Sequence, residues 1–417
     1  MQQDKLSACA VDAGRGVVYV TGSTWGDFGT PHYKPGTEGS QLMDYYNDFL
    51  AMRMDYATGE IVWSYQDQGG KQDEFVTADI EPAFGDLLVA GTTSTPWGCT
   101  DATCPYFAES VVTRPDFVAA RLALADGQPR WKWQAGTRGS EVTYAASYSA
   151  VTGQYVVAGA TASNYAKERV GMGLRDTRAY PYDSDMASTT LTAFAKPVAK
   201  WQDGTARGDR ITAVAHAPTG EVYLAGDTSG AFADDAVASL GANMVVIKQG
   251  ADGVELWRHQ NAGIVDTRIT CAATDADGNV YVGGYARLAA TEEDFYVAKL
   301  DAATGAVLWE YKAGTAESDI IQGIAVDAAG NIAVAGYTAG KFGAVNKGLY
   351  DFVVVGLSPL GVQQWAWQDG TDQSDRLNAI ASDTDAGTFV VAGDTYGTYT
   401  APNAGSWDLI VMKLTAA

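Results

Sequence analysis

The chain of 417 residues carries seven imperfect copies of one sequence pattern. The clearest example of its first half is SDIIQGIAVDAAGNIAVAGYT, which begins at Ser318, and relatives of this segment begin at Asp4, Asp73, Ser140, Gly208, Asp266 and Ser374. Self-similarity at a period of roughly 50 to 70 residues is typical of repeat architectures, in which each copy packs against its neighbours. The repeat therefore constrains the fold more than any other feature.

A second segment type alternates with the first. The best copy, DFYVAKLDAATGAVLWEY, begins at Asp294, and others begin at Asp48, Asp116 and Asp351. Weaker copies begin near Asp185 and Asn243, and the last copy, DLIVMKLTAA from Asp408, stops short. Tryptophan recurs in the final stretch of this segment, at Trp63, Trp131, Trp201, Trp257, Trp309 and Trp365. Each repeat thus predicts four short strands, which we name a to d in chain order.

Residue types predict where each strand lies. Strands b and c are rich in Val, Ile, Tyr and Phe, whereas strand a is rich in small residues such as Ala8, Ala10, Gly323 and Ala325. Small side chains fit where blades converge on a narrow axis. We therefore predict an all-β, seven-bladed β-propeller with four antiparallel strands per blade, as one domain over residues 1–417. The expected blades cover about 4–67, 73–135, 141–203, 209–260, 266–313, 319–368 and 375–417.

The last blade is predicted to lack its outer strand, because its second segment stops after strand c. One interpretation is that the chain was trimmed from something longer. The other is that the edge from Asp408 to Leu414 is completed by a strand of another chain, through β-augmentation.

Charge and hydropathy restrict partners and location. The formal net charge is −22, which disfavours binding to nucleic acid phosphates or anionic lipids. The start, MQQDKLSACAVD, lacks the basic and apolar regions of a signal peptide. No apolar run approaches the roughly 20 residues of a transmembrane helix. The chain is then either cytoplasmic or the mature part of a secreted protein, and we expect an extracellular or cell-surface location.

The segments AVDAAGNIAVAGYTAGKFG, from Ala325, and DFYVAKLDAATGAVLWEY resemble the seven-bladed β-propeller repeat family (SBBP). The resemblance covers essentially the whole chain. It implies a secreted or cell-surface protein, commonly found beside adhesion-type domains and without a general catalytic activity. The stretch Asp185–Thr192 departs from the family pattern.

The segment LDAATGAVLWEYKAG is also similar to the repeat of quinoprotein dehydrogenases and of the non-catalytic assembly-factor propellers related to them. Those enzymes usually have one blade more, and they often carry a vicinal disulfide beside the cofactor. The four cysteines of this chain include no Cys-Cys pair. We therefore expect no quinone cofactor.

Strand order predicts a single functional face. In an a-b-c-d meander the d–a and b–c connections emerge on one side, and every long insertion is a b–c connection, at 25–47, 94–115, 162–184, 229–242, 339–350 and 396–407. Aromatic residues gather in these connections, at Trp25, Phe28, His32, Tyr33, Tyr45, Tyr46, Trp97, Tyr106, Phe107, Tyr165, Tyr180, Tyr182, Tyr396, Tyr399 and Trp407. Such rings suit a protein or glycan partner, or they hold their own loops against the blades.

An acidic residue precedes strand a in each repeat, at Asp4, Asp73, Glu141, Asp209, Asp266, Asp319 and Asp375. This acidic ring at the channel mouth is a candidate for binding Ca²⁺ or a cationic ligand. The alternative, which its presence in every blade favours, is that each carboxylate caps backbone N–H groups of its own d–a connection. In the second blade, Cys99 and Cys104 either form a local disulfide or are two free thiols.

These observations favour a non-catalytic binding propeller that engages a protein or glycan on the b–c face. No residue is assigned a catalytic role, because the three histidines lie in no recognisable catalytic motif. One alternative is a hydrolase or lyase acting on polysaccharide through carboxylates on the same face, which would require two of them about 5–10 Å apart. Another is a structural subunit of a larger extracellular assembly.

Overall fold

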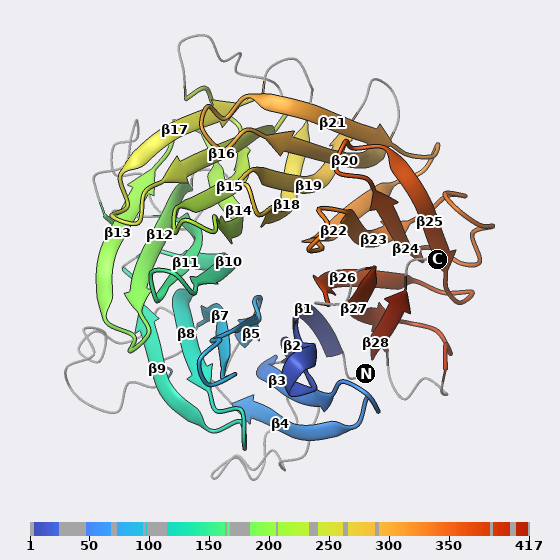
Figure 1. Cartoon of the computed structure of the whole chain (residues 1–417), viewed down its shortest axis with the longest axis horizontal. Helices are drawn as coiled ribbons and strands as arrows, with labels where there is room; N and C mark the ends of the chain where they lie inside the picture. The colour runs from blue at the N-terminus through green and yellow to red at the C-terminus, as the bar shows by residue number, and fades with distance from the viewer. Residues whose placement is uncertain are drawn as a thin grey trace, which may run out of the picture.

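The computed structural model describes residues 4–24, 47–67, 73–94, 97, 115–137, 139–162, 165–166, 184–205, 207–232, 241–261, 266–287, 292–383, 387–400 and 406–415. Over these residues the chain is all-β, with a single 3-10 turn, η1 (Ala13–Arg15). Its sheets are arranged as seven blades around one axis (Figure 1). The seven-bladed propeller predicted from the repeat is therefore confirmed. None of the helical structure in the described part is long and apolar enough to cross a membrane.

Each blade is an antiparallel meander, and strand a lies nearest the axis (Figure 1). The strands of the first three blades are β1 (Asp4–Asp12), β2 (Val17–Thr24), β3 (Asp48–Asp55) and β4 (Ile61–Asp67); β5 (Asp73–Phe75), β6 (Asp79–Ile80), β7 (Leu87–Thr93), β8 (Asp116–Leu122) and β9 (Pro129–Ala135); β10 (Glu141–Ser149), β11 (Gln154–Thr161), β12 (Asp185–Thr192) and β13 (Pro197–Asp203). In the second blade, β5 and β6 together take the place of strand a.

The remaining four blades follow the same order. Their strands are β14 (Asp209–His216), β15 (Val222–Thr228), β16 (Asn243–Gln249) and β17 (Glu255–Gln260); β18 (Thr267–Thr274), β19 (Val280–Arg287), β20 (Glu293–Leu300) and β21 (Val307–Ala313); β22 (Asp319–Val326), β23 (Ile332–Thr338), β24 (Asp351–Leu357) and β25 (Gln363–Asp369); β26 (Asp375–Ser382), β27 (Thr388–Thr395) and β28 (Asp408–Thr415). The last blade has three strands, as the shortened repeat predicts.

A bulge in strand a explains one recurring glycine of strand b. In the sixth blade the register between β22 and β23 shifts between Ile321 and Gly323, opposite Gly336. The bulge brings the backbone carbonyl of Ile320 so close that a Cβ on Gly336 would lie 1.9 Å from its oxygen. Only glycine leaves room for this approach, and the equivalent glycine in each of the other blades is equally tight, at Gly22, Gly91, Gly159, Gly226, Gly284 and Gly393.

Apolar side chains fill the spaces between neighbouring blades. One core cluster, for example, joins Tyr223 and Val246 of the fourth blade to Val282 and Tyr296 of the fifth. The Tyr223 hydroxyl is fully buried and donates a 2.6 Å hydrogen bond to the carbonyl of Gly278. Burying apolar surface between every pair of blades is the main driving force for this architecture.

In the first, second, fourth and fifth blades, a tryptophan of strand d donates a hydrogen bond to a backbone carbonyl of the next blade. Trp63 Nε1 donates to the Leu124 carbonyl of the second blade at 2.9 Å, and Trp309 Nε1 donates to the Pro359 carbonyl at 3.1 Å. In the third blade, however, Trp201 does not take this position. Ala199 pairs with Thr190 as Trp63 pairs with Arg53, so Trp201 lies two residues further along its strand.

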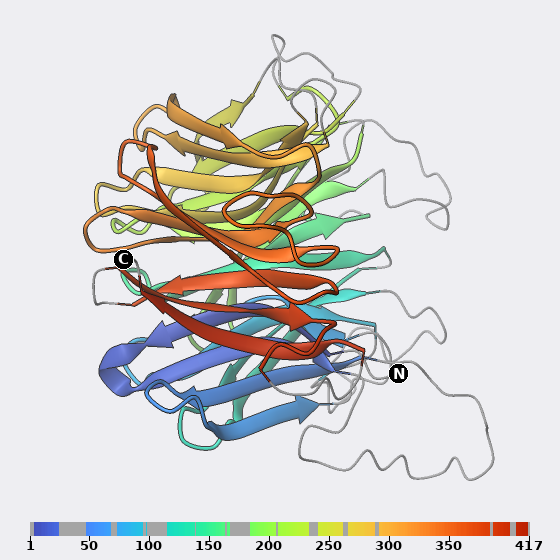
Figure 2. The same cartoon turned by 90° about the vertical axis from the view of Figure 1, so that its right-hand side faces the viewer.

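The ring closes by packing the last blade against the first. Leu6, Val18 and Val390 share one core cluster, and Asn378 Nδ2 donates a 2.8 Å hydrogen bond to the Leu6 carbonyl. The view across the axis in Figure 2 shows β26, β27 and β28 beside the strands of the first blade. Strand β28 pairs with β27, and no strand of the described part pairs with its other edge.

Candidate functional site

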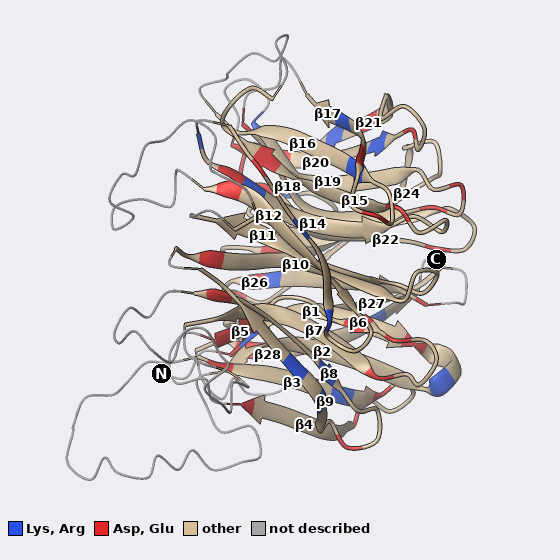
Figure 3. Cartoon of the chain, turned by 90° about the vertical axis from the view of Figure 1, so that its left-hand side faces the viewer, with Lys and Arg blue, Asp and Glu red and all other residues tan. Residues whose placement is uncertain are grey.

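The two ends of the propeller differ in what they carry. In the last blade, the start of β26 at Asp375, the end of β27 at Thr395 and the start of β28 at Asp408 lie in register at one end. This end, which we call the loop face, therefore carries the d–a and b–c connections. Acidic residues mark the strand ends on this side of the molecule (Figure 3). The opposite face carries tight turns, such as those closed by Gly278 and Gly305.

Five of the seven predicted ring acids are buried, and hydrogen bonds from their own blades hold them. Asp375 accepts hydrogen bonds from the backbone N–H and hydroxyl of Thr371 and from the hydroxyl of Thr395. Glu141 is held in the same way by Thr137 and Thr161. Equivalent threonine hydroxyls donate to Asp4, Asp73 and Asp209. These contacts are those of capping groups that fix the d–a connections.

One member of that ring is displaced. In the fifth blade, Thr267 begins strand a, and its hydroxyl accepts a 3.3 Å hydrogen bond from Asn261 Nδ2. Asp266 lies one residue earlier at a φ of 59° and pairs with Arg268. The repeat pattern of the sequence aligns Asp266 with the other ring acids. In the structure, Thr267 occupies the first position of strand a that the acids occupy in the other blades. No group of three or more His, Cys, Asp or Glu side chains in the described part is arranged to hold a metal ion.

Burial alters the acidity of several ring carboxylates. Desolvation raises the pKa of Asp209 to about 7, against the opposing effect of hydrogen bonds from Thr205 and Thr228. Desolvation also raises the pKa values of Asp319 and Asp375. A carboxylate that burial makes reluctant to ionise is a poor Ca²⁺ ligand, since that ion prefers charged oxygens.

A cavity of about 400 Å³ lies in the central channel, among the first residues of the inner strands. We call it the channel cavity. Because side chains alternate along a strand, the residue after each ring acid faces the axis while the acid itself is buried in the blade. Four cations and three tyrosines line it, at Lys5, Arg210, Arg268, Arg376, Tyr144, Tyr285 and Tyr337. On a chain with a net charge of −22, this is an unusual concentration of positive charge.

Three of these cations have carboxylate partners. Lys5 Nζ lies 2.6 Å from Glu74 Oε1, which also accepts a 2.8 Å hydrogen bond from the Ser7 hydroxyl. Arg210 Nε lies 3.0 Å from Asp227 Oδ1. Arg268 Nε lies 3.3 Å from Asp266 Oδ1. Salt bridges of this kind hold the side chains in place at the cavity wall without removing their remaining N–H donors.

The fourth cation, Arg376, is surrounded by aromatic rings instead. Its guanidinium carbon lies 5.2 Å from the ring centroids of Tyr337, Tyr350 and Trp407. It forms no ion pair with any residue that the structure describes, and its buried Nε has no hydrogen-bond partner. Asp394 lies opposite in the register of β26 and β27, but its carboxylate accepts a 2.6 Å hydrogen bond from Asn378. Burial raises the pKa of Asp394 to about 6, against the opposing effects of the Asn378 hydrogen bond and of the positive charge of Arg376, which lies too far away for an ion pair.

The predicted loop aromatics fall into two groups. Those at residues 25–46, 106–107 and 180–182 lie outside the described residues. Of the others, Trp97 is 3% exposed, and its Nε1 donates to Asp67 Oδ2 at 2.9 Å. Tyr165 is also buried, and the Tyr399 hydroxyl donates to Asp369 Oδ2 at 2.9 Å. These three rings hold the connections against the blades.

Glutamines of strand d fix the start of the b–c connection in the second, third, fourth and sixth blades, a contact that the sequence analysis missed. Gln134 Oε1 accepts from the Trp97 backbone N–H at 2.7 Å, and Gln202 Oε1 accepts from that of Tyr165 at 2.6 Å. The Gln368 side-chain oxygen accepts from Phe342 in the same way, at 2.9 Å. The signal was present as a glutamine that recurs near the end of strand d.

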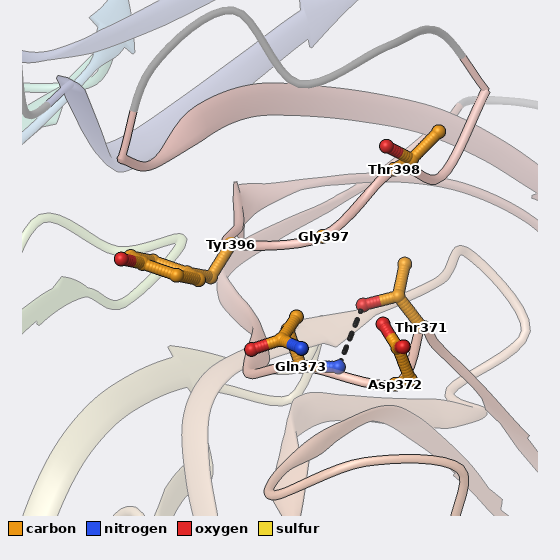
Figure 4. Close-up of a pocket in the computed structure, with 6 residues that line it drawn as sticks. All are labelled: Thr371, Asp372, Gln373, Tyr396, Gly397 and Thr398. Atoms are coloured by element: carbon orange, nitrogen blue, oxygen red, sulfur yellow. Dashed lines mark hydrogen bonds between the residues drawn. The ribbon is translucent and has the colours of Figure 1, made fainter.

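A broad hollow of about 700 Å³ lies on the loop face of the last blade (Figure 4). Its lining comes from two connections, one with Thr371, Asp372 and Gln373, and the other with Tyr396, Gly397 and Thr398. The Gln373 backbone N–H donates to the Thr371 hydroxyl at 3.2 Å. Tyr396 is 41% exposed and packs edge-on against Trp407, with ring centroids 5.5 Å apart. Among the described residues of this lining, Asp372 is the one carboxylate.

Comparison with protein families supports a propeller repeat of the quinoprotein type. Residues 199–349 match the family described as outer membrane protein assembly factor BamB. This match extends from the end of the third blade into the sixth. A comparison with curated protein sequences gave no significant match.

Solved structures share the fold at low sequence identity. Raptor of Chaetomium thermophilum is 8% identical and superposes with a TM-score of 0.57, covering 99% of this chain and 28% of Raptor. Hydrazine synthase of Kuenenia stuttgartiensis is 11% identical with a TM-score of 0.51, covering 94% of this chain and 99% of that one. The Dos1 propeller is 11% identical, with a TM-score of 0.50 and coverage of 94% and 91%. At these identities the likeness concerns the fold alone.

Proposed function

We propose that the protein is a non-catalytic binding propeller of the extracellular space or cell surface, and that it holds a protein or glycan partner on its loop face. The observation that carries this proposal is the channel cavity, whose wall is built from arginine, lysine and tyrosine side chains. Arginine and tyrosine are the residue types enriched where binding energy concentrates. The BamB-type repeat and the resemblance to the SBBP family both favour a propeller used for interaction.

An enzyme acting on polysaccharide is less well supported. Glycoside hydrolysis generally uses two carboxyl groups on either side of the scissile bond, about 5–10 Å apart. Among the described residues lining the channel cavity, Glu74 is the one carboxylate, and it already accepts hydrogen bonds from Lys5 and Ser7. The walls of the cavity supply donors and aromatic surface, which serve recognition.

The proposal is tested by screening the purified protein on peptide and glycan arrays and then measuring one bound ligand in solution. We expect the double variant Tyr285→Ala/Tyr396→Ala to lose at least about tenfold in affinity, since central aromatic anchors contribute about 2 kcal/mol or more. Phe194→Ala is the matched control, because Phe194 is 83% exposed on the opposite face. Equal loss in this control, or no ligand on either array, would contradict loop-face binding.

A second interaction surface is favoured at the open edge of β28. In three blades a tryptophan of the preceding strand d covers the glycine of the c–d turn, so that a Cβ on Gly127, Gly305 or Gly361 would lie 2.7 Å from the ring. At the equivalent Gly59 of the first blade, no described atom lies within 4 Å of that position. We propose that a tryptophan-bearing strand of another chain pairs with β28 and covers Gly59, as expected in a larger assembly.

A synthetic peptide tests this second surface. The sequence of β21, VLWEYKA, is offered in trans to the intact protein, and binding is followed by fluorescence anisotropy. We expect the peptide with tryptophan to bind at least about tenfold more tightly than the same peptide with alanine in its place, because the ring fills a preformed slot. Equal affinities for the two peptides would rule out a specific slot at Gly59.

A further inference from the structure

The side chains of the channel cavity are mostly hydrogen-bond donors. Lysine and arginine donate but accept nothing, and they make up four of the lining residues. The two threonine hydroxyls already donate within the protein: Thr212 donates to the Ile269 carbonyl and Thr270 to the Ile321 carbonyl. The carboxylate of Glu74 is occupied by Lys5 and Ser7. The amide oxygens of Gln322 and Asn378 and the tyrosine hydroxyls can accept hydrogen bonds, but the positively charged donors carry most of the charge of the lining. The cavity is therefore best matched by a negatively charged group that accepts hydrogen bonds.

Among the cations that line the channel cavity, Arg376 is the one with a buried N–H donor that has no acceptor in the described structure. Arg376 is partly buried, and it is its buried Nε–H donor that is costly to leave without an acceptor. The three surrounding rings stabilise its charge in part, but the Nε–H donor remains buried without an acceptor. A planar guanidinium presents pairs of parallel donors, which match the two oxygens of a carboxylate.

The ion pairs of the four cations also indicate which charge a ligand of the channel cavity should carry. Lys5, Arg210 and Arg268 each have a described carboxylate within salt-bridge distance, and Arg376 has none. One unpaired cation calls for one negative charge, so a carboxylate fits better than a doubly charged phosphate. A volume of about 400 Å³ admits a side chain, while a polysaccharide would have to leave its chain outside.

We infer that the channel cavity binds the carboxylate of an aspartate or glutamate side chain, which a partner protein inserts at the loop face and which pairs with Arg376. This inference rests on the proposed function and names the chemistry of its partner. Arg376 acts as the charge partner, Arg268 and Lys5 supply neighbouring donors, and Tyr285 and Tyr337 form the walls of the cavity.

The test uses the intact protein and biosensor surfaces that display four repeats of Gly-Ser-Glu. Matched surfaces display Gly-Ser-Gln, Gly-Ser-phosphoserine or oligogalacturonate. At about 0.15 M salt the Debye length is about 8 Å, which limits the general repulsion between an acidic protein and an acidic surface. We expect at least about tenfold tighter binding to the glutamate surface than to the glutamine surface, because hydrogen bonds to charged groups are the stronger ones.

Variants assign the effect to the cavity. Arg376→Gln should reduce binding to the level of the glutamine surface, and Arg376→Lys, which keeps the charge without the paired donors, should retain an intermediate affinity. Arg15→Gln, in η1 on the opposite face, should leave binding unchanged. Thermal unfolding of each variant shows whether it has folded. Because Arg376→Gln removes the ring contacts, Arg268→Gln serves as a second loss-of-binding variant that lacks those contacts.

The outcomes separate this inference from the proposed function. Equal binding to glutamate and glutamine surfaces, or stronger binding to phosphoserine or oligogalacturonate, would overturn the inference. So would an array ligand that is lost in Tyr285→Ala/Tyr396→Ala but retained by Arg376→Gln, and in that case loop-face binding itself would stand. Failure of the proposed function is different, because it would show no ligand on any array or surface.

Discussion

Replacing Gly336 by alanine is expected to destabilise the protein by about 3 kcal/mol or more, at the upper end of the cost of overpacking. The added Cβ would lie 1.9 Å from the carbonyl oxygen of Ile320 and 2.9 Å from its carbonyl carbon. Both atoms belong to the backbone of β22, so no side-chain rotation relieves the contact. The strand would have to move, and with it the packing between blades.

Urea unfolding followed by tryptophan fluorescence measures this loss. Gly14→Ala is the matched control, because the nearest atom to a Cβ at Gly14 is a flexible carboxylate oxygen of Asp12 at 3.4 Å. We expect the control to change the free energy of unfolding by less than about 0.5 kcal/mol, as is usual for surface positions. If the two variants unfold at the same urea concentration, the close approach of the strands around Gly336 is not present in solution.

The repeat made the fold predictable because its constraints are local and recur in each blade. Strand a with Ala and Gly, strands b and c with β-branched and aromatic residues, and the turns between them all occur within single segments. Even the missing outer strand of the last blade follows from the segment that starts at Asp408. Errors arose where a repeat departs from its relatives. Ala199 takes the tryptophan position in the third blade, and Thr267 takes the acid position in the fifth.

The channel cavity was not predictable in the same way. Its four cations occupy the second position of strand a, and across the seven blades that position holds Lys5, Glu74, Val142, Arg210, Arg268, Ile320 and Arg376. No linear motif connects them, since neighbouring members lie about 50 to 70 residues apart. They converge only because the fold places each inner strand around one axis (Figure 1). The acidic ring stands out in the sequence because it recurs, and its carboxylates cap the connections of their own blades. The proposed binding chemistry lies at the neighbouring position, which varies from blade to blade.

A buried ion-pair network in the second blade is the other place where one substitution should greatly lower the free energy of unfolding. Asp86 is fully buried and accepts hydrogen bonds from Arg121 Nε at 2.8 Å, from Arg130 and from the Leu124 backbone N–H at 3.0 Å. Glu81 is the second partner of Arg121, at 3.2 Å. Burial by itself raises the pKa of Asp86, but the two guanidinium groups and the backbone donor outweigh it and hold the pKa below its usual value.

We expect Asp86→Ala to lower the free energy of unfolding at pH 7 by about 3 to 5 kcal/mol, because it leaves Arg121 buried with an incomplete set of partners. The pKa of Asp86 is lower in the folded state than in the unfolded chain. Its stabilising contribution is therefore present above the unfolded pKa of about 3.9 and is lost as the pH falls through the folded value. The difference between the wild-type protein and the variant should accordingly shrink below about pH 4.

Chemical denaturation at a series of pH values measures both effects. Asp277→Ala, an exposed aspartate in a turn on the same face, is the matched control and should change stability by less than about 0.5 kcal/mol. A loss in Asp86→Ala no larger than in this control, or one that does not diminish in acid, would show that the charge of Asp86 is not what stabilises this part of the blade. Such a result would mean that the second blade is stabilised mainly by its apolar packing, around the buried side chains of Phe117 and Leu122.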